Sequence, residues 1–137
     1  KKDIIVNDKG ENVAPQKVEG MLTLQPEISQ AMIAGDRRPY MVAVIVPDPE
    51  WTQEWCAANR AVCDFKRLAE DSGYRAALSA AVDRVNQDLT VTERIRRFIL
   101  ADRPFTIENE QLTPSLKIRR HILRQVYGER LDALYKG

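Results

Sequence analysis

Apolar residues recur along this chain at two spacings, which predict two kinds of element. In residues 74–89 they recur every three or four positions, as on a helix with one apolar face. The positions are Tyr74, Ala77, Leu78, Ala81, Val82, Val85 and Leu89. Residues 41–46 are apolar without interruption. A run of this kind predicts a central strand covered on both faces.

The N-terminal segment has the pattern of a β-hairpin. In residues 3–13, two short segments with apolar residues flank the turn-forming residues 7–10. Gly10 offers a position where a positive φ carries little strain. Pro15 then opens a short helix. Its shared apolar face consists of Val18, Met21 and Leu22.

The middle of the chain predicts further strands and helices. Residues 30–34 and 40–46 are expected to pair around a turn, and residues 96–100 to form a third strand. The predicted helices cover residues 50–59, about 62–70 and 74–89, with a break at Ser72 and Gly73. The predicted fold class is therefore α+β: a short two-stranded hairpin and a small three-stranded sheet flanked by helices.

The C-terminal segment, residues 113–137, predicts a turn followed by a basic helix. Thr113 can cap this helix and Pro114 suits its first position, so Lys117 is expected at the helix opening, facing outward. The segment holds six Lys or Arg residues and two acids, a local charge of +4. This charge forms either a solvated helix face or a surface that attracts phosphate groups. Its apolar positions are Ile118, Ile122, Leu123, Val126, Tyr127 and Leu131.

Composition narrows the class of protein. The hydrophobic content of 44% and charged content of 30% are ordinary for a soluble globular domain. The net charge of +1 is far below that of a bulk nucleic-acid binder, so no nucleic-acid partner is expected. No apolar run reaches the ~18 residues that span a bilayer. A cytoplasmic location is expected, with membrane association of the full-length protein as the alternative.

Cys56 and Cys63 are the only cysteines. Their seven-residue spacing would place them on one face of a continuous helix. Together with the single His121 they supply too few ligands for zinc, and no metal site is predicted. Two buried free thiols in a reducing compartment are the favoured interpretation, with a disulfide or a metal site as the alternatives.

Other candidates are assigned structural roles. Glu19 is expected to form a structural salt bridge. Trp51 and Trp55 lie four residues apart on a predicted helix and are expected to pack in the core or at its rim. No partner that would orient His121 as a catalytic base stands out.

Two segments at opposite ends of the chain resemble motifs of one family. Residues 112–120 (LTPSLKIRR) resemble the final motif of acyl-adenylate-forming enzymes, in which a lysine precedes an arginine-bearing helix. Residues 1–15, followed by Val18 and Glu19, resemble the hinge motif of these enzymes. The whole chain resembles the C-terminal domain of a long-chain fatty acid–CoA ligase of the AMP-binding superfamily.

The resemblance implies that residues 1–137 form a single C-terminal lid domain of a larger ligase, whose N-terminal adenylation domain is absent here. The full-length enzyme would join a long-chain fatty acid to ATP as acyl-AMP and pass the acyl group to CoA. Its ATP, Mg2+ and CoA would be bound mainly by the missing domain, so this chain alone is expected to be inactive. Peripheral contact of the full-length enzyme with a membrane is a further expectation that the resemblance allows. The alternatives are a carrier-protein thiol as acceptor, or a non-catalytic basic interaction module.

The resemblance also implies residue roles. Lys117 matches the catalytic lysine that stabilises charge where carboxylate meets phosphate, and Lys2 matches the hinge about which the domain rotates. Gly10 matches a glycine whose small size admits the pantetheine of CoA. Leu116 stands where most relatives carry Gly. Asn12 stands where many carry Arg, which weakens any direct contact of this hairpin with a CoA phosphate.

Overall fold

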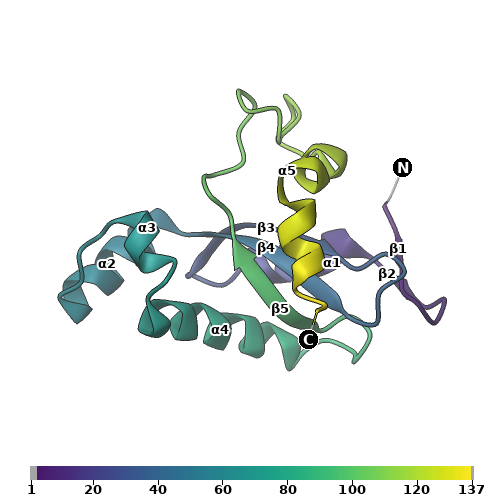
Figure 1. Ribbon diagram of the computed structural model, residues 1–137, viewed down its shortest axis with the longest axis horizontal. Coiled ribbons are helices and arrows are strands. Elements are labelled where there is room, and N and C mark those ends of the chain that lie inside the picture. Colours follow the sequence, from purple (N-terminus) through teal and green to yellow (C-terminus); the bar gives the residue numbers. More distant parts are fainter. Residues whose placement is uncertain (1–2, 137) are drawn as a thin grey trace.

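A three-stranded sheet forms the centre of the computed structural model, which describes residues 3–136 (Figure 1). The strand β4 (Met41–Pro47) is central, antiparallel to β3 (Ile28–Ala34) and parallel to β5 (Ile95–Leu100). Residues 41–46 are at most 5% exposed, which confirms the strand predicted to be covered on both faces. The three strands begin within two residues of their predicted positions.

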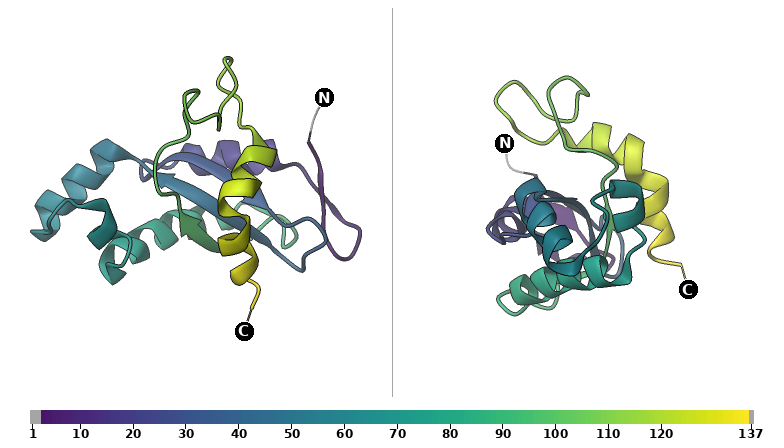
Figure 2. Two further views of the ribbon diagram at one scale, coloured as in Figure 1. Left: turned by 45° about the horizontal axis from the view of Figure 1, so that its top comes forward. Right: turned by 90° about the vertical axis from the view of Figure 1, so that its left-hand side faces the viewer.

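Alternate residues of β4 face two different layers of helices. Met41, Ala43 and Ile45 belong to the core that contains α1 (Pro15–Thr23) and α4 (Ser72–Asn86). Val42, Val44 and Val46 belong to the core that contains α5 (Arg120–Ala133). The sheet therefore lies between α5 on one side and α1 and α4 on the other (Figure 2). The predicted α+β class is confirmed.

The N-terminal hairpin pairs β1 (Ile5–Val6) with β2 (Asn12–Val13), as predicted. The Asn7 side chain closes its turn, because Oδ1 accepts hydrogen bonds from Lys9 N at 3.0 Å and Glu11 N at 2.8 Å. Gly10 has φ +80°, the left-handed conformation for which glycine carries the least strain. The prediction of a turn glycine is confirmed.

The helix predicted over about 62–70 is wrong in length. The preceding helix α2 (Pro49–Asn59) ends at Arg60, whose φ of +52° turns the chain out of the helix. Only residues Phe65–Leu68 then form a helix, α3. Asp64 caps it by accepting a hydrogen bond from Arg67 N at 3.4 Å, and this defines the later start.

The break predicted at Ser72 and Gly73 lies earlier in the chain, at residues 69–71. Both residues already belong to α4, because the Asp71 carboxylate accepts a hydrogen bond from Tyr74 N at 2.9 Å and caps the helix. The Tyr74 ring packs against both Trp51 and Trp55, with centroid distances of 5.4 and 5.3 Å. The packing role predicted for the two tryptophans is confirmed.

The predicted helix opening at Lys117 is wrong, since α5 begins at Arg120. Residues 113–117 instead form a tight turn. Thr113 N donates to the Lys117 carbonyl at 2.8 Å, and Lys117 N donates to Thr113 Oγ1 at 3.0 Å. Thr113 therefore closes a turn and caps no helix. Leu116 has φ +66°, which a right-handed helix excludes.

Within residues 3–136, no helix combines the length and apolar character that crossing a membrane requires.

The left-handed turn yields a stability prediction. Leu116 is 66% exposed, so replacing it removes little packing, while glycine adopts φ +66° without the clash of a Cβ. We expect Leu116→Gly to raise the free energy of unfolding by about 1 kcal/mol, measured by urea denaturation.

Leu24→Gly is the matched control. Leu24 is 81% exposed but has φ −76°, so glycine there relieves no strain and only adds freedom to the unfolded chain. We expect this variant to lose up to about 1 kcal/mol. Equal losses in both variants would show that the turn at Leu116 is unstrained.

Candidate functional site

Lys117 lies in the segment between β5 and α5, which projects from the sheet (Figure 1). Its side chain is exposed, and it forms no ion pair with any carboxylate of residues 3–136. The tight turn of residues 113–117 holds its backbone. This arrangement presents a cation on an ordered support, available to an anion from outside the domain.

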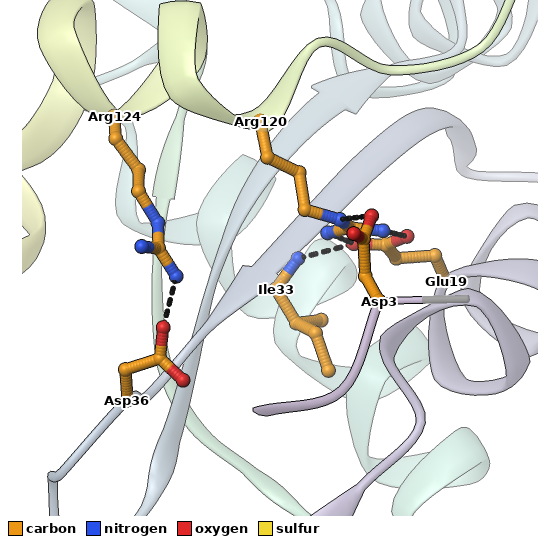
Figure 3. Close-up of polar contacts among 6 residues, drawn as sticks. All are labelled: Asp3, Glu19, Ile33, Asp36, Arg120 and Arg124. Atoms are coloured by element: carbon orange, nitrogen blue, oxygen red, sulfur yellow. Dashed lines mark hydrogen bonds and ion pairs between the residues drawn. The ribbon is translucent and has the colours of Figure 1, made fainter. Parts of the chain in front are cut away.

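Arg120 anchors this turn to the rest of the domain. It is the first residue of α5, and its guanidinium binds Glu19 through two parallel hydrogen bonds of 2.6 Å (Figure 3). Its Nε donates to Asp3 Oδ2 at 2.9 Å. Glu19 Oε2 also accepts from Ile33 N at 2.8 Å. One guanidinium thus joins α5 to α1 and the N-terminal segment, and through Glu19 to β3, and the salt bridge expected for Glu19 is confirmed.

Burial and charge act against each other at Arg120. Burial lowers the pKa of the guanidinium, but the hydrogen bonds and negative charges of Glu19 and Asp3 outweigh this effect and raise it. The group therefore stays charged. Glu19 is only 6% exposed, and its two hydrogen bonds with the Arg120 guanidinium replace contacts with water that burial removes.

Lys117 and the N-terminal segment border the same hollow of about 300 Å³. Its lining consists of Asp3, Gln16, Glu19, Lys117, Ile118 and Arg120. Two motifs from opposite ends of the sequence therefore meet in space. Lys2, the predicted hinge, lies outside the described residues, directly before Asp3. The two carboxylates that line the hollow, Asp3 and Glu19, are both paired with Arg120. Neither forms an ion pair with the Lys117 ammonium group.

Gly10 lies elsewhere, in the turn of the β1–β2 hairpin, away from the segment that carries Lys117 (Figure 1). A Cβ at this position would meet no described atom within 4 Å. Within this domain, the positive φ at position 10 explains why glycine is suitable there, since a side chain would not be crowded by neighbouring atoms. The structure does not bring Gly10 and Lys117 into one site.

Half of the cations of the C-terminal segment pair with acids from other elements. Arg120 pairs with Glu19 and Asp3, as described above. Arg124 pairs with Asp36, and Arg130 pairs with Asp102 at 3.0 Å. Three of the six cations are therefore engaged within the domain. Pairs of this kind leave no continuous cationic surface along α5, the surface that a basic interaction module would need.

Local patterns in the sequence do not indicate the role of Arg120 and Asp3. Both residues lie inside the two quoted motifs, which was the available signal. Their pairing joins residues 117 positions apart, however, and no local pattern predicts such a contact.

The chain matches a known protein family over almost its whole length. Residues 2–137 match the family model described as the AMP-binding enzyme C-terminal domain. The chain is 36% identical to the long-chain-fatty-acid–CoA ligase FadD15 of Mycobacterium tuberculosis, over 98% of this chain and 23% of that protein. It is 29% identical to long-chain-fatty-acid–CoA ligase 5 of Rattus norvegicus, over 100% of this chain and 20% of that protein.

Solved structures give the same result. The adenylation domain of the carboxylate reductase of Mycobacterium chelonae superposes with a TM-score of 0.79 at 30% identity, covering 98% of this chain and 19% of that one. The A-PCP didomain of the carboxylic acid reductase of Segniliparus rugosus, in complex with AMP, gives 0.78 at 31% identity, covering 98% and 17%. The chain spans less than a quarter of each of these relatives. Because the family model covers residues 2–137, the chain belongs to the family of AMP-binding enzyme C-terminal domains.

Proposed function

We propose that this chain is the C-terminal domain of a long-chain fatty acid–CoA ligase. The full-length enzyme would activate a fatty acid with ATP to acyl-AMP and transfer the acyl group to CoA. The observation that carries the proposal is the placement of Lys117, an exposed cation on an ordered turn anchored beside the N-terminal segment. The ligase names of the relatives support long-chain fatty acids as the substrate class.

Lys117 would act in the first half-reaction. A carboxylate approaching the α-phosphate of ATP meets an existing negative charge, and more charge develops in the transition state. An ammonium group aimed between the two sets of oxygens offsets both, and one such donor contributes roughly 3–4 kcal/mol. The anchored turn would place this group in advance, which lowers the cost of organising the site.

The second half-reaction would require Lys117 to leave. In the proposed cycle the domain rotates about Lys2. Arg120 fastens the Lys117 turn to Asp3, directly after this hinge, so a change of backbone angle at residue 2 would move the turn with the whole domain. Rotation would then present another face, and Gly10 would allow the pantetheine of CoA to pass the hairpin.

Most of the substrate contacts are assigned to an N-terminal adenylation domain, the proposed partner of this chain. Among residues 3–136, no group of three or more His, Cys, Asp or Glu side chains is arranged to hold a metal ion. We therefore assign Mg2+, together with the main sites for ATP, CoA and the acyl chain, to that domain. On this basis residues 1–137 alone are inactive.

A second candidate is an adenylate-forming enzyme whose acceptor is a carrier-protein thiol. The observation in its favour is the similarity to two carboxylic acid reductase structures, with TM-scores of 0.79 and 0.78. The CoA acceptor is favoured because the relatives compared by sequence are named as CoA ligases.

Lys117→Ala tests the proposed catalytic role. In the full-length enzyme we expect adenylation of palmitate with ATP to slow by about 100-fold or more, since one transition-state donor is lost. Thioester formation from supplied acyl-AMP and CoA should be retained, because Lys117 is then turned away. Lys66→Ala, which removes an exposed lysine on α3, is the control and should affect neither step. Equal loss of both half-reactions in Lys117→Ala would make Lys117 a structural residue.

Lys2→Pro tests the proposed hinge. Proline fixes φ near −65° at its own position and restricts the residue before it, so the rotation should be hindered. We expect thioester formation from supplied acyl-AMP to slow more than adenylation, the reverse of the Lys117→Ala pattern. Lys2→Ala keeps the backbone free and should retain both steps. Normal thioester formation in Lys2→Pro would place the hinge elsewhere.

The acceptor is tested directly with preformed palmitoyl-AMP. The full-length enzyme would be offered CoA in one reaction and a carrier protein bearing phosphopantetheine in another, and the thioester products measured by mass spectrometry. We expect palmitoyl-CoA to form at least about tenfold faster, which corresponds to roughly 1.4 kcal/mol in barrier height. Faster acylation of the carrier protein would favour the second candidate.

A further inference from the structure

Cys56 and Cys63 lie close together although they do not share a helix. Cys56 is near the end of α2, which ends at Asn59, and the left-handed Arg60 then reverses the chain. The two cysteines therefore do not lie on one face of a continuous helix, the arrangement that their seven-residue spacing would otherwise allow. The reversal places the two Sγ atoms 2.8 Å apart, and both residues are free thiols.

The two thiols differ in their access to solvent. Cys56 is 4% exposed, whereas Cys63 is exposed, so the prediction of two buried thiols is wrong for Cys63. Cys63 also lines an apolar hollow of about 350 Å³, which includes Thr52 and Phe65. A small reagent in this hollow meets the sulfur of Cys63 before that of Cys56.

The environment of Cys56 keeps it protonated. Burial, followed by the hydrogen bond to Cys63, raises the pKa of Cys56 to about 11. Cys56 therefore donates its S–H to the sulfur of the exposed Cys63. The exposed thiol is the one favoured as a nucleophile.

We propose that Cys56 and Cys63 form a redox-active dithiol that a low-molecular-weight disulfide oxidises to an intramolecular disulfide. The Cys63 thiolate attacks one sulfur of the reagent R–S–S–R, forming a mixed disulfide and releasing RS⁻. Cys56 then attacks the Cys63 sulfur and displaces the second RS⁻. The two thiol protons pass to the released thiolates, so the protein loses two hydrogen atoms and the reagent becomes two R–SH.

The geometry favours this closure within one chain. A disulfide bond is ~2.05 Å long, so sulfurs already 2.8 Å apart need only a small movement. The intervening segment, residues 57–62, is short and contains the chain reversal at Arg60. Within residues 3–136 no third metal-binding side chain joins the pair, so the thiols are not part of a larger metal cluster.

The bond would fasten the end of α2 to the segment that precedes α3. Both helices lie at the end of the domain opposite the β1–β2 hairpin, and away from the projecting segment between β5 and α5 (Figure 1). The dithiol is thus separate from Lys117, and its oxidation is testable without any measurement of ligase activity.

The test exposes the 137-residue chain to oxidised glutathione and measures intact mass after acid quenching. We expect the wild-type chain to lose two hydrogen atoms, and peptide mapping to join Cys56 to Cys63. In Cys56→Ser the reaction should stop at a glutathione adduct on Cys63. In Cys63→Ser no adduct should form, because Cys56 is buried. Dithiothreitol should restore the original mass of the wild-type chain.

Three results would overturn the proposal: an unchanged wild-type mass, a lasting glutathione adduct on the wild-type chain, or a disulfide between two chains on non-reducing gels. An adduct in Cys63→Ser but not in Cys56→Ser would refute the assigned order of attack. Circular dichroism establishes that each variant is folded, and Cys56→Ala replaces Cys56→Ser if the buried hydroxyl unfolds the chain.

Discussion

The buried ion pair between Glu19 and Arg120 is the interaction on which the placement of the candidate site depends. Their side chains are only 8% and 15% exposed, so each charge has lost most of its contact with water. Two hydrogen bonds of 2.6 Å, with further bonds to Ile33 N and Asp3, replace that hydration. Removing one partner from such a pair typically costs 3–5 kcal/mol, because the other charge stays buried and unpaired.

A second ion pair extends this connection along α5. Arg124 lies one helical turn after Arg120 and pairs with Asp36, in the turn between β3 and β4 (Figure 3). Asp36 Oδ1 also accepts a hydrogen bond from Val6 N at 3.3 Å. One face of α5 is thus linked to α1, the sheet and the N-terminal hairpin. Under the proposed function, the Lys117 turn and the Gly10 hairpin move as parts of one rigid body.

In the proposed cycle, this rigidity would make the Lys117 turn and the Gly10 hairpin move together. Under the proposed function, catalysis of two half-reactions by one domain would require the lysine and the hairpin that contains Gly10 to occupy different faces, so that one rotation could exchange them. The structure separates Gly10 from Lys117, while Arg120 keeps the Lys117 turn beside Asp3, next to the proposed hinge. Arg120 and Arg124 of α5 serve as anchors through their ion pairs, whereas Lys117 forms no ion pair with any carboxylate of residues 3–136.

Local patterns in the sequence determined much of the fold. The unbroken apolar run of β4 and the helical spacing of α4 predicted both elements, because the spacing of apolar residues within one element indicates which of its faces are buried. Gly10 marked the hairpin turn for a similar reason: its φ is a local property. The family membership also followed from local motifs, since each motif is contiguous.

Tertiary structure decided where those motifs lie and what holds them. Arg60 and Leu116 both have a positive φ. Arg60 ends a helix and Leu116 prevents one from starting, although the sequence pattern predicted helix close to both places. The spacing of apolar residues gives no information on the sign of φ at residues other than glycine. The bond between Glu19 and Arg120 spans 101 positions, and many other carboxylates could pair with that guanidinium in an unfolded chain. Only the packing of α1 and α5 against the sheet selects this pair, and with it the position of Lys117.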